Sequence, residues 1–494
     1  MGSIIVSDTS KHYELFERLG KGGVGAVFRA VCKEDGKTYA FKYFKPDPND
    51  VQLMLVHNNI KKNIANLIKT PLKAVGGKEL TSFIGPKDMI SNVPGKGGFG
   101  YIMEFKDTSH CGSIFKSWKK PEQYKPDARA TMEICIKIAE IFDRIHASGR
   151  CYKDVNEGNI YLDSQNNNVY IIDSDNIAPD GVKTIFGTLK YVAPEVYTTE
   201  TPNTVSDRFS MATFFYRLMV GGYPLEGKKT VKYLMDNQLD DNDFISAKAA
   251  YADRALFAFD ERDKSNTIRN VTEKYIPDDH KSSWKIQTVY WDLLPQSIRD
   301  MFLSVFSDHL LGEARDRRPS EKQWIRVFDS VLEKGLVKCK CGKYNYSGNK
   351  ECIFCGKSIA SLKVTPCPRN GAAATDFSVT VPVKQKCNSV KFKLLTGKGG
   401  EIVASQLDGN DACPSLFSRG QIILSVIDYN KTEKMMKCKN VSGFRFTLSH
   451  PNGKIINVVN GASVFLMKGS QLDLLIDGKA ALKMSAIDFV AETD

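Results

Sequence analysis

The 494-residue sequence lacks long apolar segments and is poor in cysteine, and each absence excludes a class of protein. No apolar run approaches the ~20 residues that a membrane-spanning helix requires. The first residues show no charged segment followed by an apolar core, so we expect no secretory signal. The 12 cysteines are too sparse for a disulfide-stapled scaffold. We therefore expect a cytoplasmic protein with reduced thiols and no membrane partner.

The charge balance is basic but not extreme. The formal net charge is +12, while 42% of the residues are apolar and 26% are charged, as in an ordinary globular protein. The lysines are dispersed along the chain and form no single block. This pattern favours a solvated basic surface, so we expect no nucleic-acid partner.

Hydrophobic periodicity divides the first two thirds of the chain into a β-rich part and a helical part. Alternating residues around glycine-rich turns predict a β-meander over 13–45, and a helical pattern follows over 51–69. Later helical patterns begin at about residue 128 and resume after Pro194. Residues 257–290 are polar and weakly patterned, which predicts an insertion or extended loop. A cleft between two such lobes suits a nucleotide.

The composition changes near residue 337. A cysteine-rich module spans 338–358, and a stretch with Pro, Gly and Ala at 359–375 predicts a linker. Short alternating runs punctuated by Gly and Asn then fill 376–490, which is typical of an all-β sandwich.

Five short motifs follow one another before residue 196. A G-x-G-x-x-G-x-V loop at 20–27 precedes Lys42, and Asp154-Val-Asn-Glu-Gly-Asn159 precedes an Asp-Ser-Asp at 173–175 and an Ala-Pro-Glu at 193–195. Glycines let backbone N–H groups approach phosphates closely, and carboxylate and amide oxygens are ligands that Mg²⁺ prefers. Their common order and spacing indicate phosphoryl transfer from ATP.

These motifs resemble the protein kinase family over about residues 13–332, and their spellings are similar to divergent bacterial Ser/Thr kinases of stress- and tellurite-response clusters. The resemblance implies an α+β, two-lobed kinase-like fold with an N-lobe at 13–105 and a C-lobe at 106–335. It implies an ATP- and Mg²⁺-dependent Ser/Thr protein kinase that transfers the γ-phosphoryl group to a protein hydroxyl. It also implies a protein substrate and a phosphatase or von Willebrand-type partner.

The resemblance assigns catalytic roles residue by residue. Asp154 would accept or orient the proton of the substrate hydroxyl, Lys42 would hold the α and β phosphates, and Asn159 and Asp173 would ligate magnesium. Nucleotide binding is expected at Gly20, Gly22, Gly25, Val27, Ala40, Lys42, Met103, Glu104 and Phe105.

Two supporting interactions are implied as well. Glu195 would pair with Arg318, and Asp207 would brace the catalytic loop. Gly187-Thr188 would form the edge on which a peptide docks, which argues against a small-molecule phosphotransferase.

The sequence departs from the family at several positions. Tyr152-Lys153 replaces the usual His-Arg, and Ser174-Asp175 replaces the Phe-Gly of Asp-Phe-Gly. No Glu occurs between residues 34 and 79, so the expected helix carries no Glu to pair with Lys42. Three residues remain as partners, of which Asp50 is preferred because it starts the helical pattern; the others are Gln52 and His57. These losses motivate the alternative of a pseudokinase scaffold that binds nucleotide and partner proteins without turnover.

Four cysteines predict a metal site. Cys339-x-Cys341-Gly and Cys352-x-x-Cys355-Gly resemble a zinc ribbon, in which two thiolate pairs on tight turns complete a tetrahedron around structural Zn²⁺. With all four ligands supplied by sulfur, the site has no open position for catalysis. The C-terminal β-domain resembles a forkhead-associated domain distantly. Its Ser418-Arg419 and Asn440 echo phosphopeptide-binding loops only in isolation, so a plain interaction domain is expected.

Overall fold

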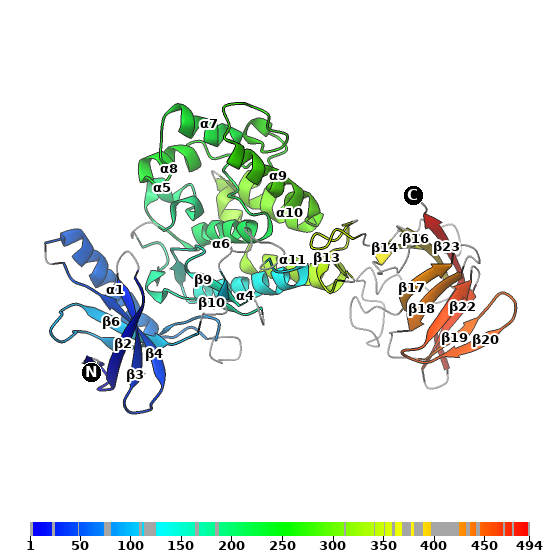
Figure 1. Cartoon of the computed structure of the whole chain (residues 1–494), viewed down its shortest axis with the longest axis horizontal. Helices are drawn as coiled ribbons and strands as arrows, with labels where there is room; N and C mark the ends of the chain where they lie inside the picture. Colours follow the sequence, from blue (N-terminus) through cyan, green and yellow to red (C-terminus); the bar gives the residue numbers. More distant parts are fainter. Residues whose placement is uncertain are drawn as a thin grey trace. The chain divides into compact units, whose positions relative to one another are not determined.

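The computed structural model of the chain forms two compact units, Met1–Pro126 with Glu133–Phe328 and Asp127–Met132 with Asp329–Asp494 (Figure 1). It describes residues 3–21, 25–47, 49–73, 81–107, 111–112, 125–163, 167–182, 187–310, 313–339, 341–349, 351–357, 361–367, 377–379, 389–396, 424–430, 435–440, 445–467, 470–476 and 479–492. Within these residues, no helix combines the length and the apolar content needed to cross a membrane.

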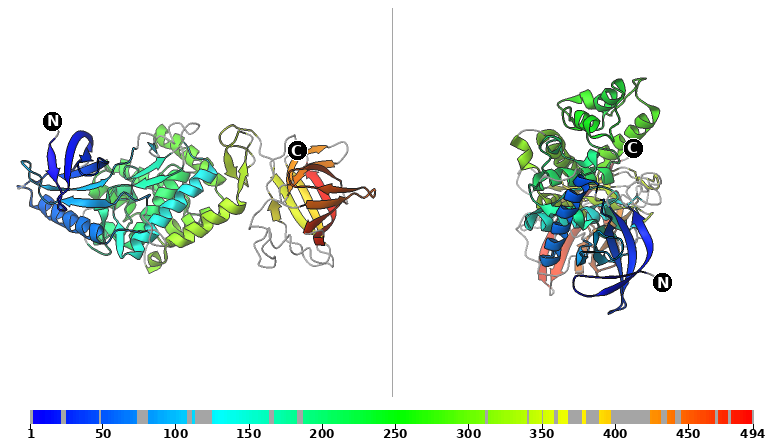
Figure 2. Two further views of the ribbon diagram at one scale, coloured as in Figure 1. Left: turned by 90° about the horizontal axis from the view of Figure 1, so that it is seen from below. Right: turned by 90° about the vertical axis from the view of Figure 1, so that its left-hand side faces the viewer.

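The first unit begins with a six-stranded antiparallel sheet in the order β1-β2-β3-β4-β6-β5. Figures 1 and 2 show helix α1 (Val51–Lys69) lying against this sheet. The predicted strands and helix are present, but the sheet starts earlier than residue 13, because β1 pairs with β2. The strands are β1 (Ile4–Val6), β2 (His12–Lys21), β3 (Ala26–Cys32), β4 (Thr38–Phe44), β5 (Pro86–Ile90) and β6 (Phe99–Glu104).

Alternation along the strands gives this sheet two apolar faces. Phe41 and Ile102 belong to a buried cluster on one face. Ala40, Phe44 and Tyr101 belong to a second cluster, which α1 joins through Ile64 and other residues. Because side chains of a strand point alternately to opposite faces, Lys42 shares the α1 side with Ala40 and Phe44.

The rest of the first unit is mainly helical around an aromatic core. Tyr216, Phe257, Trp291 and Phe306 pack with ring centroids 5.3–6.3 Å apart. The helices and helical turns are α4 (Ala128–Ala147), η2 (Ser174–Asn176), η3 (Leu189–Tyr191), α5 (Val196–Thr199), α6 (Thr204–Met219), α7 (Lys228–Asp236), α8 (Phe244–Tyr251), η4 (Lys264–Asn266), α9 (Asp278–Leu293), α10 (Gln296–Leu303), the π-helical η5 (Ser304–Asp308), η6 (Glu313–Arg317) and α11 (Glu321–Lys334).

The prediction of a loop throughout 257–290 is wrong, because α9 begins within it. Its polar first turn and many exposed positions hide the helical pattern. The residues it buries, Trp284, Gln287 and Trp291, recur at intervals of three and four, which is the spacing of one helix face.

Short strand pairs position the loops between these helices. β8 (Arg150–Tyr152) pairs with β11 (Ile177–Pro179), and β9 (Ile160–Asp163) pairs with β10 (Val169–Ile171) and with β7 (Cys111–Gly112). The loop after β8 and the turn after β10 are thereby held beside each other, because Lys153 donates its backbone N–H to Asn176 O at 3.1 Å.

The second unit is built of short antiparallel strands and two larger sheets. β12 (Leu336–Lys338) pairs with β13 (Tyr344–Tyr346). A seven-stranded sheet has the order β15-β14-β16-β23-β22-β19-β20, and a three-stranded sheet has the order β17-β18-β21. These strands are β14 (Ser361–Cys367), β15 (Phe377–Val379), β16 (Ser389–Thr396), β17 (Leu424–Asn430), β18 (Met435–Asn440), β19 (Arg445–Ser449), β20 (Ile455–Val458), β21 (Ser463–Met467), β22 (Ser470–Ile476) and β23 (Lys479–Glu492).

The predicted linker at 359–375 needs correction, because β14 lies inside it. β14 pairs in parallel with β16 over 361–367. Its antiparallel pairing with β15 is limited to 362–364. Pro366, which suggested a linker, therefore lies beyond the last β15 pair, where its missing N–H interrupts no ladder on that side.

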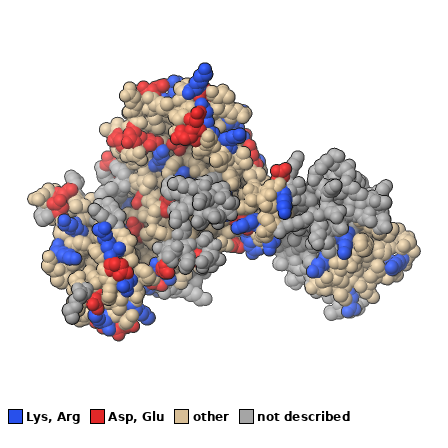
Figure 3. Space-filling view, in the orientation of Figure 1, with Lys and Arg blue, Asp and Glu red and all other residues tan. Residues whose placement is uncertain are grey.

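The surface charge is mixed on the face shown in Figure 3. Lys and Arg are interspersed with Asp and Glu over the described residues of the first unit there. No broad single-sign area covers that part of the face, in line with the dispersed lysines of the sequence.

Candidate active site

Lys42 lies in the middle of β4 on the face that α1 covers, and its side chain is only 6% exposed. Its ammonium lies 3.1 Å from a carboxylate oxygen of Asp173 and donates to both oxygens of Asp175, at 2.9 and 3.1 Å. Burial alone would lower the pKa of Lys42, but the two carboxylates outweigh burial and raise it. Lys42 is therefore a buried, protonated cation held by two acids.

The turn after β10 presents these two acids. Asp173 has a left-handed backbone (φ 59°, ψ 54°), which Asp tolerates better than most residues. The reversal leaves its side chain 27% exposed, while that of Asp175 is 3% exposed. Burial and the adjacent Asp175 carboxylate raise the pKa of Asp173, against the opposing effect of Lys42. A further cation beside this carboxylate would stabilise its charged form.

Asp154 and Asn159 face each other in the loop after β8. The amide nitrogen of Asn159 donates to the backbone O of Asp154 at 2.9 Å and to its Oδ2 at 3.0 Å. Asn156 shapes the turn between them by accepting from the backbone N–H groups of Gly158 and Asn159. The backbone O of Asn159 in turn accepts from the N–H of Ile172, next to Asp173. This bond joins the predicted magnesium ligand Asn159 to the residue that precedes the other predicted ligand, Asp173.

A buried carboxylate on α6 braces this loop. Asp207 accepts a hydrogen bond from the backbone N–H of Tyr152 and another contact from His146 Nε2 at 3.0 Å. The hydroxyl of Tyr152 donates to Ile172 O at 2.8 Å. The predicted brace by Asp207 is confirmed, and Tyr152, which stands where the family has His, ties the catalytic loop to the turn that carries Asp173.

The segment that begins at Gly187 contacts Asp154. Thr188 donates both its backbone N–H and its hydroxyl to Asp154 Oδ1, each at 2.9 Å. A Cβ on Gly187 would lie 2.3 Å from Lys153 O, so only glycine permits this approach. The predicted Glu195–Arg318 pair is confirmed as a bidentate contact at 2.6 and 2.9 Å. A hydroxyl at position 188 therefore reaches Asp154, and the Glu195–Arg318 pair anchors the segment from Gly187 to Glu195 that carries it.

Four of the predicted nucleotide-binding residues form an apolar wall. Ala40 and Met103 are buried in one cluster, and Val27 and Phe105 pack against it. This composition suits an adenine ring. Glu104 at the end of β6 pairs with Lys106.

The glycine loop is described only at its two ends. Gly20 pairs with Val27 across β2 and β3. A Cβ on Gly25 would lie 2.6 Å from Tyr43 O, which explains the glycine there. Gly22 lies outside the described residues.

The expected partner of Lys42 is wrong. Asp50 instead caps α1, because its side chain accepts from the backbone N–H of Leu53. His57 is buried against the rings of Phe44 and Phe99. The motifs alone do not predict Asp175 as a partner of Lys42; the available signal is an extra acid in the position of the family's glycine.

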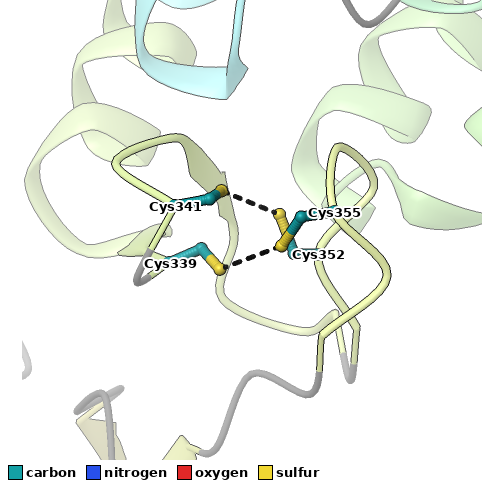
Figure 4. A group of neighbouring side chains, drawn as sticks. All are labelled: Cys339, Cys341, Cys352 and Cys355. Atoms are coloured by element: carbon teal, nitrogen blue, oxygen red, sulfur yellow. Dashed lines mark hydrogen bonds between the residues drawn. The ribbon is translucent and has the colours of Figure 1, made fainter.

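Four thiols converge in the second unit (Figure 4). The sulfur atoms of Cys339 and Cys355 are 3.7 Å apart, those of Cys341 and Cys352 are 3.6 Å apart, and all four lie within 4.8 Å of one another. These distances are too long for disulfides, whereas a tetrahedron with Zn–S bonds of ~2.3 Å has edges of ~3.8 Å. The four residues therefore fit a zinc ion.

Hydrogen bonds also fix the cysteine turns. Asn345, which is 1% exposed, donates to Cys352 Sγ at 3.4 Å and accepts from the backbone N–H of Ile353. Gly342 and Gly356, which follow the cysteine pairs, have φ values of 90° and 65°. Both glycines adopt the left-handed backbone that such turns need.

Comparison with known proteins agrees with this geometry. Residues 13–290 match the family model described as protein kinase domain. The match covers more than half of the chain, and the chain therefore belongs to the protein kinase family. This finding confirms the assignment that the motifs predicted.

Individual relatives are distant. Protein kinase 2 of Dictyostelium discoideum is 25% identical over 250 residues, which are 49% of this chain and 48% of the relative. The cAMP-dependent protein kinase type 3 of Saccharomyces cerevisiae is 23% identical over 299 residues, 58% of this chain and 69% of the relative. Ribosomal protein S6 kinase alpha-2 of Mus musculus is 26% identical over 259 residues, 50% and 32% respectively. The chain thus spans about half the length of the first relative and a third of the last.

Proposed function

We propose that this protein is an ATP- and Mg²⁺-dependent kinase that phosphorylates serine or threonine hydroxyls of proteins. The observation that carries the proposal is the convergence of Lys42, Asp154, Asn159 and Asp173 within one unit, although 131 residues separate the first from the last. A cation, a proton acceptor and two oxygen ligands for Mg²⁺ are the groups that phosphoryl transfer requires.

Each residue has a defined task in this proposal. Bound magnesium would neutralise developing negative charge on the transferred group. Asn159 and Asp173 would hold it through their side-chain oxygens. Lys42 would bind phosphate oxygens from the β4 side. Asp154 would accept the hydrogen bond of the attacking hydroxyl, as it now accepts that of Thr188.

The choice of Ser/Thr over tyrosine rests on two observations. The Thr188 hydroxyl contacts Asp154 on a short side chain, so the segment passes close to the carboxylate. Another relative is named a probable serine/threonine-protein kinase. A protein substrate fits the anchored segment from Gly187 to Glu195.

The proposal includes the remaining parts of the chain. A structural Zn²⁺ would join Cys339, Cys341, Cys352 and Cys355 in a ribbon at about 338–358. The β-strands that follow would form a sandwich for protein interaction, in the manner of a forkhead-associated domain. The bacterial-type likeness and a phosphatase or von Willebrand-type partner rest on the departures from the family motifs. A cytoplasmic location suits the buried free thiols Cys32, Cys135 and Cys151.

Transfer of labelled phosphate tests the proposal. The full chain is incubated with γ-labelled ATP, Mg²⁺ and a general acceptor protein, beside Asp154→Ala and Asp173→Ala. Both variants should lose ~10²–10³-fold in rate, because each removes a group that acts on the transferred phosphoryl. Acid hydrolysis should release phosphoserine or phosphothreonine.

The matched control is Asp278→Ala, which removes an aspartate that is 97% exposed at the start of α9. Its rate should equal that of the wild type. Equal labelling of all four proteins would refute the assigned chemistry. Nucleotide binding without any transfer would identify a scaffold instead, and label on tyrosine alone would overturn the Ser/Thr assignment.

A further inference from the structure

Both acids that contact Lys42 come from one turn. Asp173 and Asp175 follow β10, whereas helix α1, which packs on the same side of the sheet, contains neither Asp nor Glu. The helix side facing the sheet carries Ile60 and Ile64, in the cluster around Phe44 and Tyr101, and the imidazole of His57, which packs on Phe44. Helix α1 therefore offers Lys42 no counter-ion.

Asp175 is bound more completely than Asp173. Its Oδ1 accepts from Lys42 at 2.9 Å and from the hydroxyl of Tyr101 at 2.9 Å, and its Oδ2 accepts from Lys42 at 3.1 Å. Tyr101 lies directly across from Lys42 in the ladder between β4 and β6, and its hydroxyl is fully buried. Tyr101, Lys42 and Asp175 thus form a buried hydrogen-bonded cluster on the face of the sheet that α1 covers.

The two acids differ in what remains available to a ligand. The Asp173 side chain keeps 27% of its surface exposed, so its oxygens can face a metal ion. Asp175, at 3% exposure, uses both of its oxygens within the protein. Placing a second carboxylate beside the first is electrostatically unfavourable unless a cation joins them, and Lys42 is that cation.

We propose that Asp175 is the positioning residue of Lys42. It lies in the turn after β10 and performs the task that an acidic residue on α1 would otherwise perform. The inference rests on the proposed kinase function, because positioning matters only if Lys42 binds phosphate. It further implies that α1 supplies no charge partner of Lys42. Asp175 touches neither nucleotide nor metal in this proposal and acts through Lys42 alone.

A double-mutant cycle tests whether Asp175 acts through Lys42. Rates are measured for the full-length wild type, Asp175→Asn, Lys42→Ala and the double variant. Asp175→Asn should lower kcat by at least about tenfold, and Lys42→Ala by ~10²–10³-fold. The double variant should match Lys42→Ala within about threefold, because groups acting as a unit are not additive.

Two controls separate positioning from other roles. Asp50→Asn removes the acid nearest to α1 but keeps an N-capping side chain, so kcat should not change. The Mg²⁺ concentration for half-maximal rate should be unaltered in Asp175→Asn. Multiplicative losses in the cycle, or a higher Mg²⁺ concentration for half-maximal rate in Asp175→Asn, would overturn the proposal and indicate a metal ligand.

A readout without turnover keeps the inference testable if the wild type transfers no phosphate, in which case the proposed function alone fails. A crystal structure of the wild type with an ATP analogue and Mg²⁺ provides this readout. Asp175 should stay within hydrogen-bond distance of Lys42 Nζ, and the metal ion should bind Asp173 but not Asp175. A metal ion bound by Asp175, or a Lys42 ammonium separated from Asp175, would overturn the proposal, even if Asp175→Asn fails to fold.

Discussion

His146 on α4 is an imidazole held between two carboxylates. Its Nδ1 lies 2.9 Å from Glu321 and its Nε2 lies 3.0 Å from Asp207, so both ring nitrogens carry protons. Burial opposes this charge, but the two hydrogen bonds prevail and raise the pKa of His146 to about 9. Burial likewise opposes the charge of Glu321, yet contact with His146 lowers its pKa to about 2.

These shifts predict a pH dependence of stability. A His with a raised folded pKa stabilises the fold fully below its ordinary value near 6.5, and that contribution is lost as the pH rises to about 9. The full shift corresponds to about 3 kcal/mol. We expect the urea midpoint of the wild type to fall between pH 6.5 and 9.5 by more than that of His146→Gln.

His280→Gln, at the start of α9, is the control and should follow the wild-type profile. Parallel profiles of the wild type and His146→Gln would show that the imidazole is neutral in the fold. Loss of the Glu321 contribution belongs to a separate window, from about pH 4.5 down to about 2.

The proximity of two residues was predictable from sequence where both belong to one short motif. Asp154 and Asn159 lie five positions apart and meet in one loop. The partner of Lys42 was different, because Asp175 is 133 residues away and reaches it through the fold. Short-range sequence patterns do not indicate which of several acidic residues contacts the ammonium of Lys42 in the folded protein.

At the scale of elements, periodic segments were the predictable ones. The pattern over 51–69 coincides with α1, and strands β3 and β4 lie within the β-meander predicted over 13–45. α9 was missed because only three of its residues are buried. β14 was missed because a strand surrounded by Pro, Gly and Ala becomes ordered through pairing with β16, which no local signal encodes.

The four-cysteine module at 338–358 is the element that we propose a metal ion stabilises. β12 and β13 are too short to be stable alone, and zinc binding contributes ~10–16 kcal/mol to folding in small modules. We expect metal analysis of the purified chain to find one zinc per molecule. Cys352→Ser should lose it, whereas Cys32→Ser, which changes a thiol outside the cluster, should retain it. Zinc retained at full stoichiometry by Cys352→Ser would place the ion elsewhere.

At the scale of the whole molecule, the proposed catalytic residues and the proposed metal ligands belong to different units. The quartet Lys42, Asp154, Asn159 and Asp173 lies in the first unit, and the four cysteines lie in the second. In this proposal the two units carry separate tasks. The change of composition near residue 337 falls inside the second unit, whose main segment begins at Asp329.

This separation predicts that loss of zinc spares phosphoryl transfer. Cys352→Ser should keep kcat within about twofold of the wild type, since none of the catalytic interactions involves the ribbon. The assay is the labelling reaction described above, with Cys32→Ser as the matched variant. A loss of tenfold or more in Cys352→Ser alone would show that the ribbon controls the catalytic unit.

The origin of both counter-ions in one turn also bears on inhibition. A compound that displaces α1 removes no charge partner of Lys42, since both of its counter-ions come from the turn after β10. A compound that binds this turn engages the counter-ion Asp175 and the proposed metal ligand Asp173 together. Selective chemical probes of this protein should therefore be sought among molecules that reach the 173–175 turn.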